Sequence, residues 1–427
     1  MSEYRGYSGR ALEFLKQNKV KVGDTIKITT DSDYTGTIMP RYEHTDDKHI
    51  VLKFKNGYNV GLEITQVKKV EYISTIEPNQ EKNTTTVFNP SLPKVLLLST
   101  GGTIASRVDY RTGSVTPALS AQDLNASVPE LSEIANIDAE VLFSEYSENL
   151  TPEHWIKIAQ RLDSLAKSDY KGIIVAHGTD TMQYTAAFLS FSLAGFPKPI
   201  VLVGSQRSSD RPSSDAATNL ISATRFIVNC KVNGVFVAMH NTESDDEIAC
   251  HLGTRVRKNH TSKRNAFETM GGKPAFIITQ NEIIQNFSGS YFKEAQYTPN
   301  IKIDTKVALI KYHPGYDPKL VDEMINLGYR AIIFEGTGLG HIGKTMYDAI
   351  KKAREKKIFL GMTSQCLDGR VNMAVYESGR DLLHLGIVPL SDIISETALV
   401  KAMWAVATHD KNIEEIMLKN IASEITE

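Results

Sequence analysis

The feature that most constrains this fold is a series of unbroken apolar runs that recur from Lys94 onward. The runs of the first series are KVLLLST, GIIVAHG, PIVLVGS, GVFVAMH and PAFIITQ. Because they lack the polar–apolar alternation of a half-exposed strand, they are typical of strands buried on both faces of a parallel sheet. A second series, VALIKYH, AIIFEG and KIFLGMT, follows residue 305 among helical stretches. The pattern predicts an α/β fold in two lobes with mainly parallel sheets.

The N-terminal part follows a different pattern. Residues 8–19 have the apolar spacing of a short amphipathic helix, whereas residues 22–73 form short alternating runs separated by turn signals such as Asn56-Gly57. Such runs predict a small β-barrel, and the polar, proline-containing stretch after them predicts a linker. We therefore expect a barrel domain with a short helix at 1–75, a linker at 76–93, a catalytic lobe at 94–285, a connecting segment at 286–305 and a C-terminal lobe at 306–427.

Composition narrows the class of protein. Hydrophobic residues make up 41% of the chain and charged residues 23%, which suits a protein with a full buried core. The 48 basic and 50 acidic residues nearly cancel, so global charge gives no support to direct nucleic-acid binding. The three scattered cysteines do not form a disulfide framework, and no apolar run is long enough to span a membrane. We expect a cytoplasmic protein without a membrane anchor.

Two threonine motifs follow strands of the first series. The first apolar run leads into STGGTIAS, residues 99–106, and the second into HGTDTM, residues 177–182. Glycine beside each threonine lets backbone N–H groups approach a developing oxyanion. A threonine hydroxyl is a weak nucleophile and needs a neighbouring base, for which Asp180 and a lysine of RVRKNHTSKRNAF are the candidates. The alternative is that Asp180 or Thr181 only caps the next helix.

These two motifs together resemble the signature motifs of the L-asparaginase family. The segments YSENLTPEHW, VLVGSQRSSDRPSSDAATNL and RKNHT resemble further parts of the same family in the same order. The resemblance implies an asparaginase-like two-lobed fold and an amidohydrolase without a metal or other cofactor. Its implied catalytic residues are Thr103 as nucleophile, Tyr110 on a closing segment, and the supporting group Thr179, Asp180 and Lys258. Lys263 remains the alternative to Lys258. The implied substrate-binding residues are Gly102, Ser147, Glu148 and Gly178, and Asp180 helps Ser147 hold the α-groups of the substrate.

Two departures from common asparaginases and the N-terminal domain refine the resemblance. Glu148 replaces a neutral polar residue, which predicts a carboxylate facing the α-ammonium group of the substrate. Leu339 replaces an asparagine between two glycines. With the preceding barrel, these features resemble the family of D-type subunits of archaeal glutamyl-tRNA(Gln) amidotransferases.

That resemblance implies a glutaminase that supplies ammonia to a partner subunit of the E type. The partner would use ATP and Mg, and the complex would convert Glu-tRNA(Gln) to Gln-tRNA(Gln). It also implies a chain that pairs with a second copy of itself. A free-standing L-asparaginase is the alternative, and the choice between glutamine and asparagine stays open because one methylene changes binding by only ~1–3 kcal/mol.

Two other patterns suggest different chemistry. Gly338–Thr345 fits the phosphate-binding pattern G-x4-G-K-T and follows a strand-like run, which would indicate a nucleotide triphosphatase. The next apolar run, KIFLGMTSQ, lacks the aspartate that would hold Mg²⁺, so this interpretation is the weaker one. The segment from His240 to His251 contains carboxylates and a cysteine that could bind zinc, but its spacing fits no standard site. We expect a solvated acidic loop there.

Overall fold

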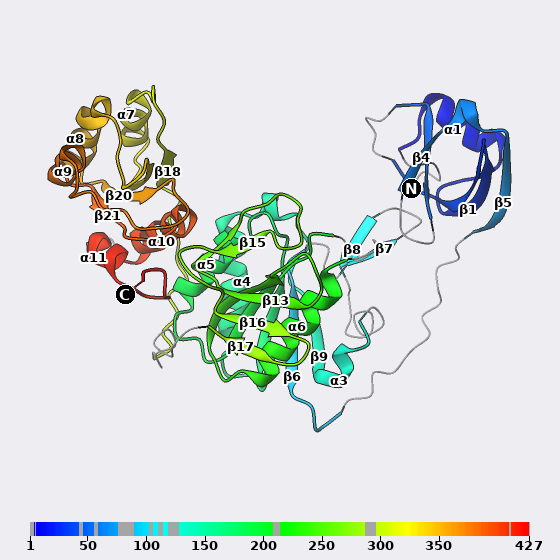
Figure 1. The fold of residues 1–427 in the computed structure, drawn as a ribbon, viewed down its shortest axis with the longest axis horizontal. Helices are drawn as coiled ribbons and strands as arrows, with labels where there is room; N and C mark the ends of the chain where they lie inside the picture. The colour runs from blue at the N-terminus through cyan, green and yellow to red at the C-terminus, as the bar shows by residue number, and fades with distance from the viewer. Residues whose placement is uncertain are drawn as a thin grey trace.

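The computed structural model describes the whole chain except a set of short segments. These are residues 1–3, 5, 42–45, 55–58, 76–88, 102–105, 110–113, 118–127, 208–213, 287–295, 410 and 427. Figure 1 shows the described helices and strands in three groups along the chain: an N-terminal sheet in blue, a central sheet in cyan and green, and a C-terminal sheet in yellow to red.

The N-terminal group is a helix packed on an antiparallel sheet. Helix α1 spans Gly9–Gln17, as its apolar spacing predicted, and buries Ala11 and Leu15. The strands are β1 (Asp24–Thr29), β2 (Asp33–Ile38), β3 (His49–Lys53), β4 (Asn59–Glu63) and β5 (Lys69–Thr75), in the order β4-β3-β2-β1-β5. Strands β3 and β4 flank Asn56-Gly57, which lies outside the described residues, and they pair antiparallel as a hairpin requires. Among the described residues no ladder joins β4 to β5, so closure into a barrel is not confirmed.

The central sheet has the order β17-β16-β13-β12-β11-β10-β6-β9. Its parallel part consists of β9 (Asn136–Val141), β6 (Lys94–Ser99), β10 (Gly172–Ala176), β11 (Pro199–Val203) and β12 (Gly234–His240). Its antiparallel part consists of β13 (Glu247–Leu252), β16 (Phe276–Thr279) and β17 (Ile283–Gln285). The run PAFIITQ therefore forms an antiparallel strand, and the sheet as a whole is mixed.

Helices cover both faces of the parallel part, which explains its unbroken apolar runs. Alternate residues such as Leu96 and Leu98 face a core shared with α4 (Pro152–Ser164) and α5 (Met182–Ser192). Their neighbours Val95 and Leu97 face a second core shared with α3 (Leu131–Ile134) and α6 (Ala216–Asn229). Because both faces are buried, the carboxyl ends of the strands are the edge where loops can carry polar side chains.

The C-terminal group is a parallel sheet with helices on both faces. Its strands are β18 (Val307–Lys311), β19 (Ala331–Gly336), β20 (Phe359–Ser364) and β21 (Val388–Pro389). Helices α7 (Lys319–Asn326), α8 (Tyr347–Glu355) and α9 (Glu377–His384) share one core with it. Helix α10 (Ser395–Thr408) contacts β18, β19 and β20 and also packs against α5 of the central group, and the short α11 (Ile413–Leu418) follows it (Figure 1). The α5–α10 contact, with Phe191 stacked on Trp404, joins the two lobes.

Within the part of the chain that the structure describes, every helix is too short or too polar to cross a lipid bilayer.

Candidate active site

The first two apolar strands of the series end side by side. Thr100, directly after β6, donates its N–H and its hydroxyl to the carbonyl of Ala176 at the end of β10, at 3.0 and 2.9 Å. Gly101 follows with a φ of +116°, and a Cβ at that position would lie 2.2 Å from the carbonyl oxygen of Glu145. Only glycine fits both the conformation and the space. The exits of β6 and β10 and the segment around residue 145 therefore meet at one place.

The segment after Glu145 forms the floor of this place. A short 3-10 helix covers Ser147–Asn149, with Ser147 buried and Glu148 exposed. The hydroxyl of Thr181 donates to the carbonyl of Ser147 at 2.8 Å. A Cβ on Gly178 would lie 2.7 Å from the Cβ of Ser147, so these two predicted substrate-binding residues are in close contact. Helix capping by Thr181 is not observed, because its side chain makes no cap hydrogen bond to α5.

A lysine from a distant hairpin completes the arrangement. The hairpin consists of β14 (Val256–Lys258) and β15 (Phe267–Thr269). The ammonium of Lys258 donates to the hydroxyl of Thr179 at 2.8 Å and to the carboxylate of Asp180 at 2.6 Å. The side chain of Lys258 is 10% exposed, whereas that of Asp180 is 65% exposed. An amine so placed can exchange a proton with the threonine hydroxyl once it has lost its own, and the carboxylate fixes its position.

The alternative lysine lies elsewhere. Lys263 pairs with Glu243 at 3.4 Å, and both side chains are more than half exposed, at 52% and 69%. The structure thus brings Lys258, and not Lys263, to Thr179 and Asp180.

Three of the predicted residues lie outside the described part of the chain: Gly102, Thr103 and Tyr110. Their roles remain predictions.

The structure adds two residues that sequence reasoning missed. The ring of His177 is buried, and both of its nitrogens have hydrogen-bond partners. Nδ1 lies 2.6 Å from the carbonyl oxygen of Gly178, and Nε2 lies 2.8 Å from the hydroxyl of Thr185. Burial lowers the pKa of His177 to about 4, so the ring is neutral at pH 7. Gly204, after β11, packs against Thr179, because a Cβ on Gly204 would lie 2.8 Å from Thr179 Cγ2. The sequence offers only a weak signal for either: each adjoins the end of an apolar run.

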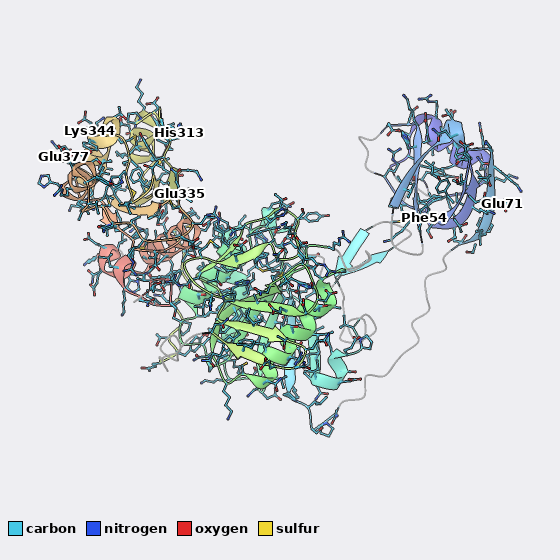
Figure 2. All side chains as sticks on the ribbon, in the orientation of Figure 1. Phe54, Glu71, His313, Glu335, Lys344 and Glu377 are labelled. Atoms are coloured by element: carbon cyan, nitrogen blue, oxygen red, sulfur yellow. The ribbon has the colours of Figure 1, made fainter. Side chains whose placement is uncertain are left out.

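The phosphate-binding pattern does not form a phosphate cradle. The loop amides turn inward, since Gly340 and His341 both donate to the carbonyl of Thr337 at 3.0 Å. A short 3-10 helix spans Lys344–Met346 before α8 begins, and Lys344 is among the solvent-facing side chains of the C-terminal lobe (Figure 2). A nucleotide cradle needs free amides that converge on the phosphate, and the amides of Gly340 and His341 are instead bound to Thr337.

The segment considered for zinc is only partly a loop. His240 ends β12 and residues 247–252 form β13, so the expectation of a solvated loop is wrong for those residues and holds only for the turn at 241–246. The apolar residues Ile248, Ala249 and Cys250 are buried, which explains why this stretch becomes a strand. Within the residues that the structure describes, no cluster of three or more His, Cys, Asp or Glu side chains could hold a metal.

Three protein families match successive parts of the chain. The family description "Asparaginase, N-terminal" matches residues 94–288, "Glutaminase/Asparaginase C-terminal domain" matches residues 306–417, and "GatD N-terminal domain" matches residues 20–73. The chain is 44% identical over 429 residues to the D-type subunit of the glutamyl-tRNA(Gln) amidotransferase from Pyrococcus abyssi, with 98% of each chain covered. It is 46% identical to the protein of the same name from Sulfolobus acidocaldarius, over 98% of this chain and 95% of that one.

Among solved structures, the fold is similar to the thermostable L-asparaginase from Thermococcus kodakarensis. The TM-score is 0.71 at 32% identity, covering 78% of this chain and 99% of that one. It is also similar to L-asparaginase I from Vibrio cholerae, with a TM-score of 0.68 at 25% identity, covering 79% of this chain and 100% of that one.

Proposed function

The chain belongs to the family of D-type subunits of glutamyl-tRNA(Gln) amidotransferases, and from this premise we propose that it is the glutaminase subunit of a tRNA-dependent amidotransferase. The observation that carries the proposal is the match along 98% of both chains to such a D-type subunit. That match runs through the N-terminal sheet as well as the asparaginase-like lobes, and the family description for residues 20–73 is specific to this kind of subunit. A free-standing L-asparaginase would need only the two lobes.

In the proposed reaction, the hydroxyl of Thr103 attacks the side-chain amide carbonyl of glutamine. The C–N bond breaks, ammonia leaves with the proton that it needs, and an ester links the substrate to Thr103. Water then cleaves the ester, which releases glutamate and restores the hydroxyl. Lys258, Thr179 and Asp180 supply proton transfer, and Tyr110 closes the site. The backbone around Gly102 and Gly178, with Ser147 and Glu148, holds the substrate.

The ammonia serves a partner subunit of the E type in the same complex. That subunit uses ATP and Mg to activate the glutamate of Glu-tRNA(Gln), so this chain needs no cofactor of its own. We place the complex in the cytoplasm, with two copies of the chain paired in it. The N-terminal unit, closed into a barrel, would contact the partner complex.

We expect glutamine hydrolysis to depend on assembly. Ammonia released without an acceptor is wasted, so such a site works best when only the assembled state completes it. The isolated chain should hydrolyse glutamine slowly, and addition of the partner subunit with Glu-tRNA(Gln) should clearly raise the rate. Ammonia release measured with and without each component tests this.

A variant lacking residues 1–75 should keep the basal rate and lose most of the rise, with its unfolding midpoint measured as a control for folding. Fast hydrolysis by the lone chain, indifferent to both additions, would make it a free-standing asparaginase and contradict the proposal.

Glu148→Gln tests the substrate contact. Glu148 lies exposed on the short helix next to buried Ser147, and this exposure leaves its carboxylate free to meet the α-ammonium that we propose it binds. Loss of one charge-assisted hydrogen bond of about 1.5 kcal/mol should raise KM about tenfold and change kcat little. Glu145→Gln, an exposed carboxylate of the same segment, is the matched control and should leave KM unaltered. An unchanged KM in Glu148→Gln would remove this contact from the mechanism.

A further inference from the structure

A chain of hydrogen bonds leads from the end of β12 to the loop that follows Lys258. His240 is fully buried at the end of β12, with Nδ1 2.7 Å from Oδ1 of Asn219 and Nε2 3.0 Å from Oδ1 of Asp245. Arg264, in the β14–β15 connection, donates to the same carboxylate oxygen of Asp245 at 2.8 Å. The side chain of Arg264 is only 17% exposed. Neither His240 nor Arg264 has a part in the mechanism derived above.

The partners of Asn219 fix the orientation of its amide. Its Nδ2 donates to the carbonyl of Gly204 at 3.0 Å and to the carboxylate of Asp215 at 3.1 Å. The carbonyl of Gly204 and the carboxylate of Asp215 are both acceptors. Reversing the side-chain amide of Asn219 would place its oxygen against these two oxygens, so Oδ1 points at His240 instead. Asp215 is itself fully buried and accepts the N–H groups of Gln206 and Arg207, which holds the loop after β11 in place.

The ring of His240 therefore bridges two fixed groups, Oδ1 of Asn219 on its Nδ1 side and the carboxylate of Asp245 on its Nε2 side. The charged groups that face this network are Asp245 and Arg264 directly and Asp215 through Asn219. Because the ring is fully buried, it cannot turn without losing one of these two contacts.

The network closes on the active site at both ends. At one end, Asn219 holds the carbonyl of Gly204, and Gly204 packs against the methyl of Thr179. At the other end, Arg264 holds the loop that begins directly after Lys258. Within that loop the backbone N–H of Asn259 donates to the carbonyl of Ala266 at 2.7 Å. The hydrogen bond from Lys258 to Thr179 completes the circuit. Motion at either end would change the distance between these two groups.

We propose that His240 is a positioning residue. Through Asn219 it fixes the Gly204–Thr179 side of the site, and through Asp245 and Arg264 it fixes the hairpin that carries Lys258. The inference deepens the proposed glutaminase function and rests on it for its kinetic consequence. The brace itself, defined as Asn219, His240, Asp245 and Arg264, rests on the geometry alone.

The test compares His240→Asn, Arg264→Gln and their double variant in the full chain, alone and with the partner subunit. Asparagine can keep a donor toward Asn219 and is too short to reach Asp245, so it opens the brace at one link. Each single variant should lower kcat for glutamine by about ten- to a hundredfold, because a misplacement near 1 Å has effects of that size. KM should change less than kcat. The double variant should be no worse than the worse single variant, since both break the same brace.

Lys263→Ala is the matched control. Lys263 pairs with Glu243 across the same two loops, but at the exposed surface. This variant should retain the kcat and KM of the unaltered chain. Losses in the double variant that simply multiply, or a kcat loss in Lys263→Ala equal to that in Arg264→Gln, would overturn the proposal.

Hydrogen exchange is a readout that does not need glutaminase activity. Exchange of residues 259–266 should speed up in His240→Asn and Arg264→Gln but not in Lys263→Ala. Unchanged exchange refutes the brace even if the chain is an active glutaminase. A chain that hydrolyses no glutamine in any state refutes the proposed function, while the exchange measurement still decides the brace.

Discussion

Replacing Lys258 with methionine should lower kcat for glutamine hydrolysis by about 10²- to 10⁴-fold, the range for loss of a positioned proton-transfer group. Methionine keeps most of the apolar stem that fills this largely buried position and removes only the amine. The group lost is the one that lies 2.8 Å from the hydroxyl of Thr179 and 2.6 Å from Asp180. The fold should persist, and the unfolding midpoint checks this.

The chain supplies its own control for this variant. Lys263→Met removes an amine five positions along the chain that pairs with Glu243 at the exposed surface. It should leave kcat within about twofold, as surface substitutions have small effects. Thr179→Val should resemble Lys258→Met, and the double variant should lose little more than either, because residues that act as a unit are strongly non-additive. A fast Lys258→Met enzyme beside a slow Lys263→Met enzyme would reverse the assignment.

The sequence predicts four parallel strands of the central sheet, β6, β10, β11 and β12, because helices cover both of their faces and their residues are mostly apolar. It misses the fifth parallel strand, the edge strand β9, whose sequence NIDAEV is mixed and mostly half-buried. The same rule does not reach β13. Its His251 is buried against the hydroxyl of Thr269, and its Glu247 lies at the strand end. These polar residues interrupt the apolar pattern, so the sequence does not predict this strand, which is antiparallel and lies inside the sheet.

The candidate site is predictable in its residue types and not in its contacts. Thr179 and Asp180 follow an apolar strand, which signals the functional edge of a parallel sheet. Their partner Lys258 is 79 positions from Thr179 and sits on a strand of three residues, too short to show any periodicity. Only family resemblance favoured it over Lys263. The brace around His240 is less predictable still, because its four residues lie in separate segments of the chain and meet only through side-chain hydrogen bonds.

The C-terminal tail is held by a fully buried ion pair. Lys401 on α10 and Glu424 in the tail are both 0% exposed in their side chains and lie 2.5 Å apart. Lys401 also donates to the carbonyls of Met417 and Lys419, at 3.0 and 2.6 Å. Glu424 accepts the N–H groups of Ile421 and Ala422. Burial lowers the pKa of Lys401, and the charge of Glu424 opposes this shift.

The tail that Glu424 secures also contacts the central lobe. Thr254 donates its hydroxyl to the carbonyl of Ala422 at 2.8 Å, and Arg255 donates to the carbonyl of Ser423 at 2.7 Å. These two residues directly precede the strand that carries Lys258. The ion pair therefore supports the joint between the lobes close to the candidate site.

Glu424→Gln should reduce the free energy of unfolding by about 3–5 kcal/mol, because it leaves the ammonium of Lys401 buried without a counter-charge. Glutamine keeps an oxygen for the N–H groups of Ile421 and Ala422, and its NH₂ group then faces the ammonium of Lys401, so the change removes both the counter-charge and one acceptor of that ammonium. Lys401→Met combined with Glu424→Gln should recover most of the loss, since a neutral pair no longer buries an uncompensated ion. Asp322→Asn, which breaks the more exposed Lys352–Asp322 pair between α7 and α8, should change stability by at most about 1 kcal/mol.

Urea unfolding followed by the fluorescence of Trp404 measures these differences where they arise, because Trp404 lies on α10 with Lys401. The second tryptophan, Trp155, can be replaced by phenylalanine to leave one reporter, since among the described residues its indole N–H has no hydrogen-bond partner to lose. If Glu424→Gln and Asp322→Asn weaken the protein equally, the buried pair has no special part in holding the lobes. If the double variant is as unstable as Glu424→Gln alone, the loss comes from the tail's geometry rather than from an uncompensated charge.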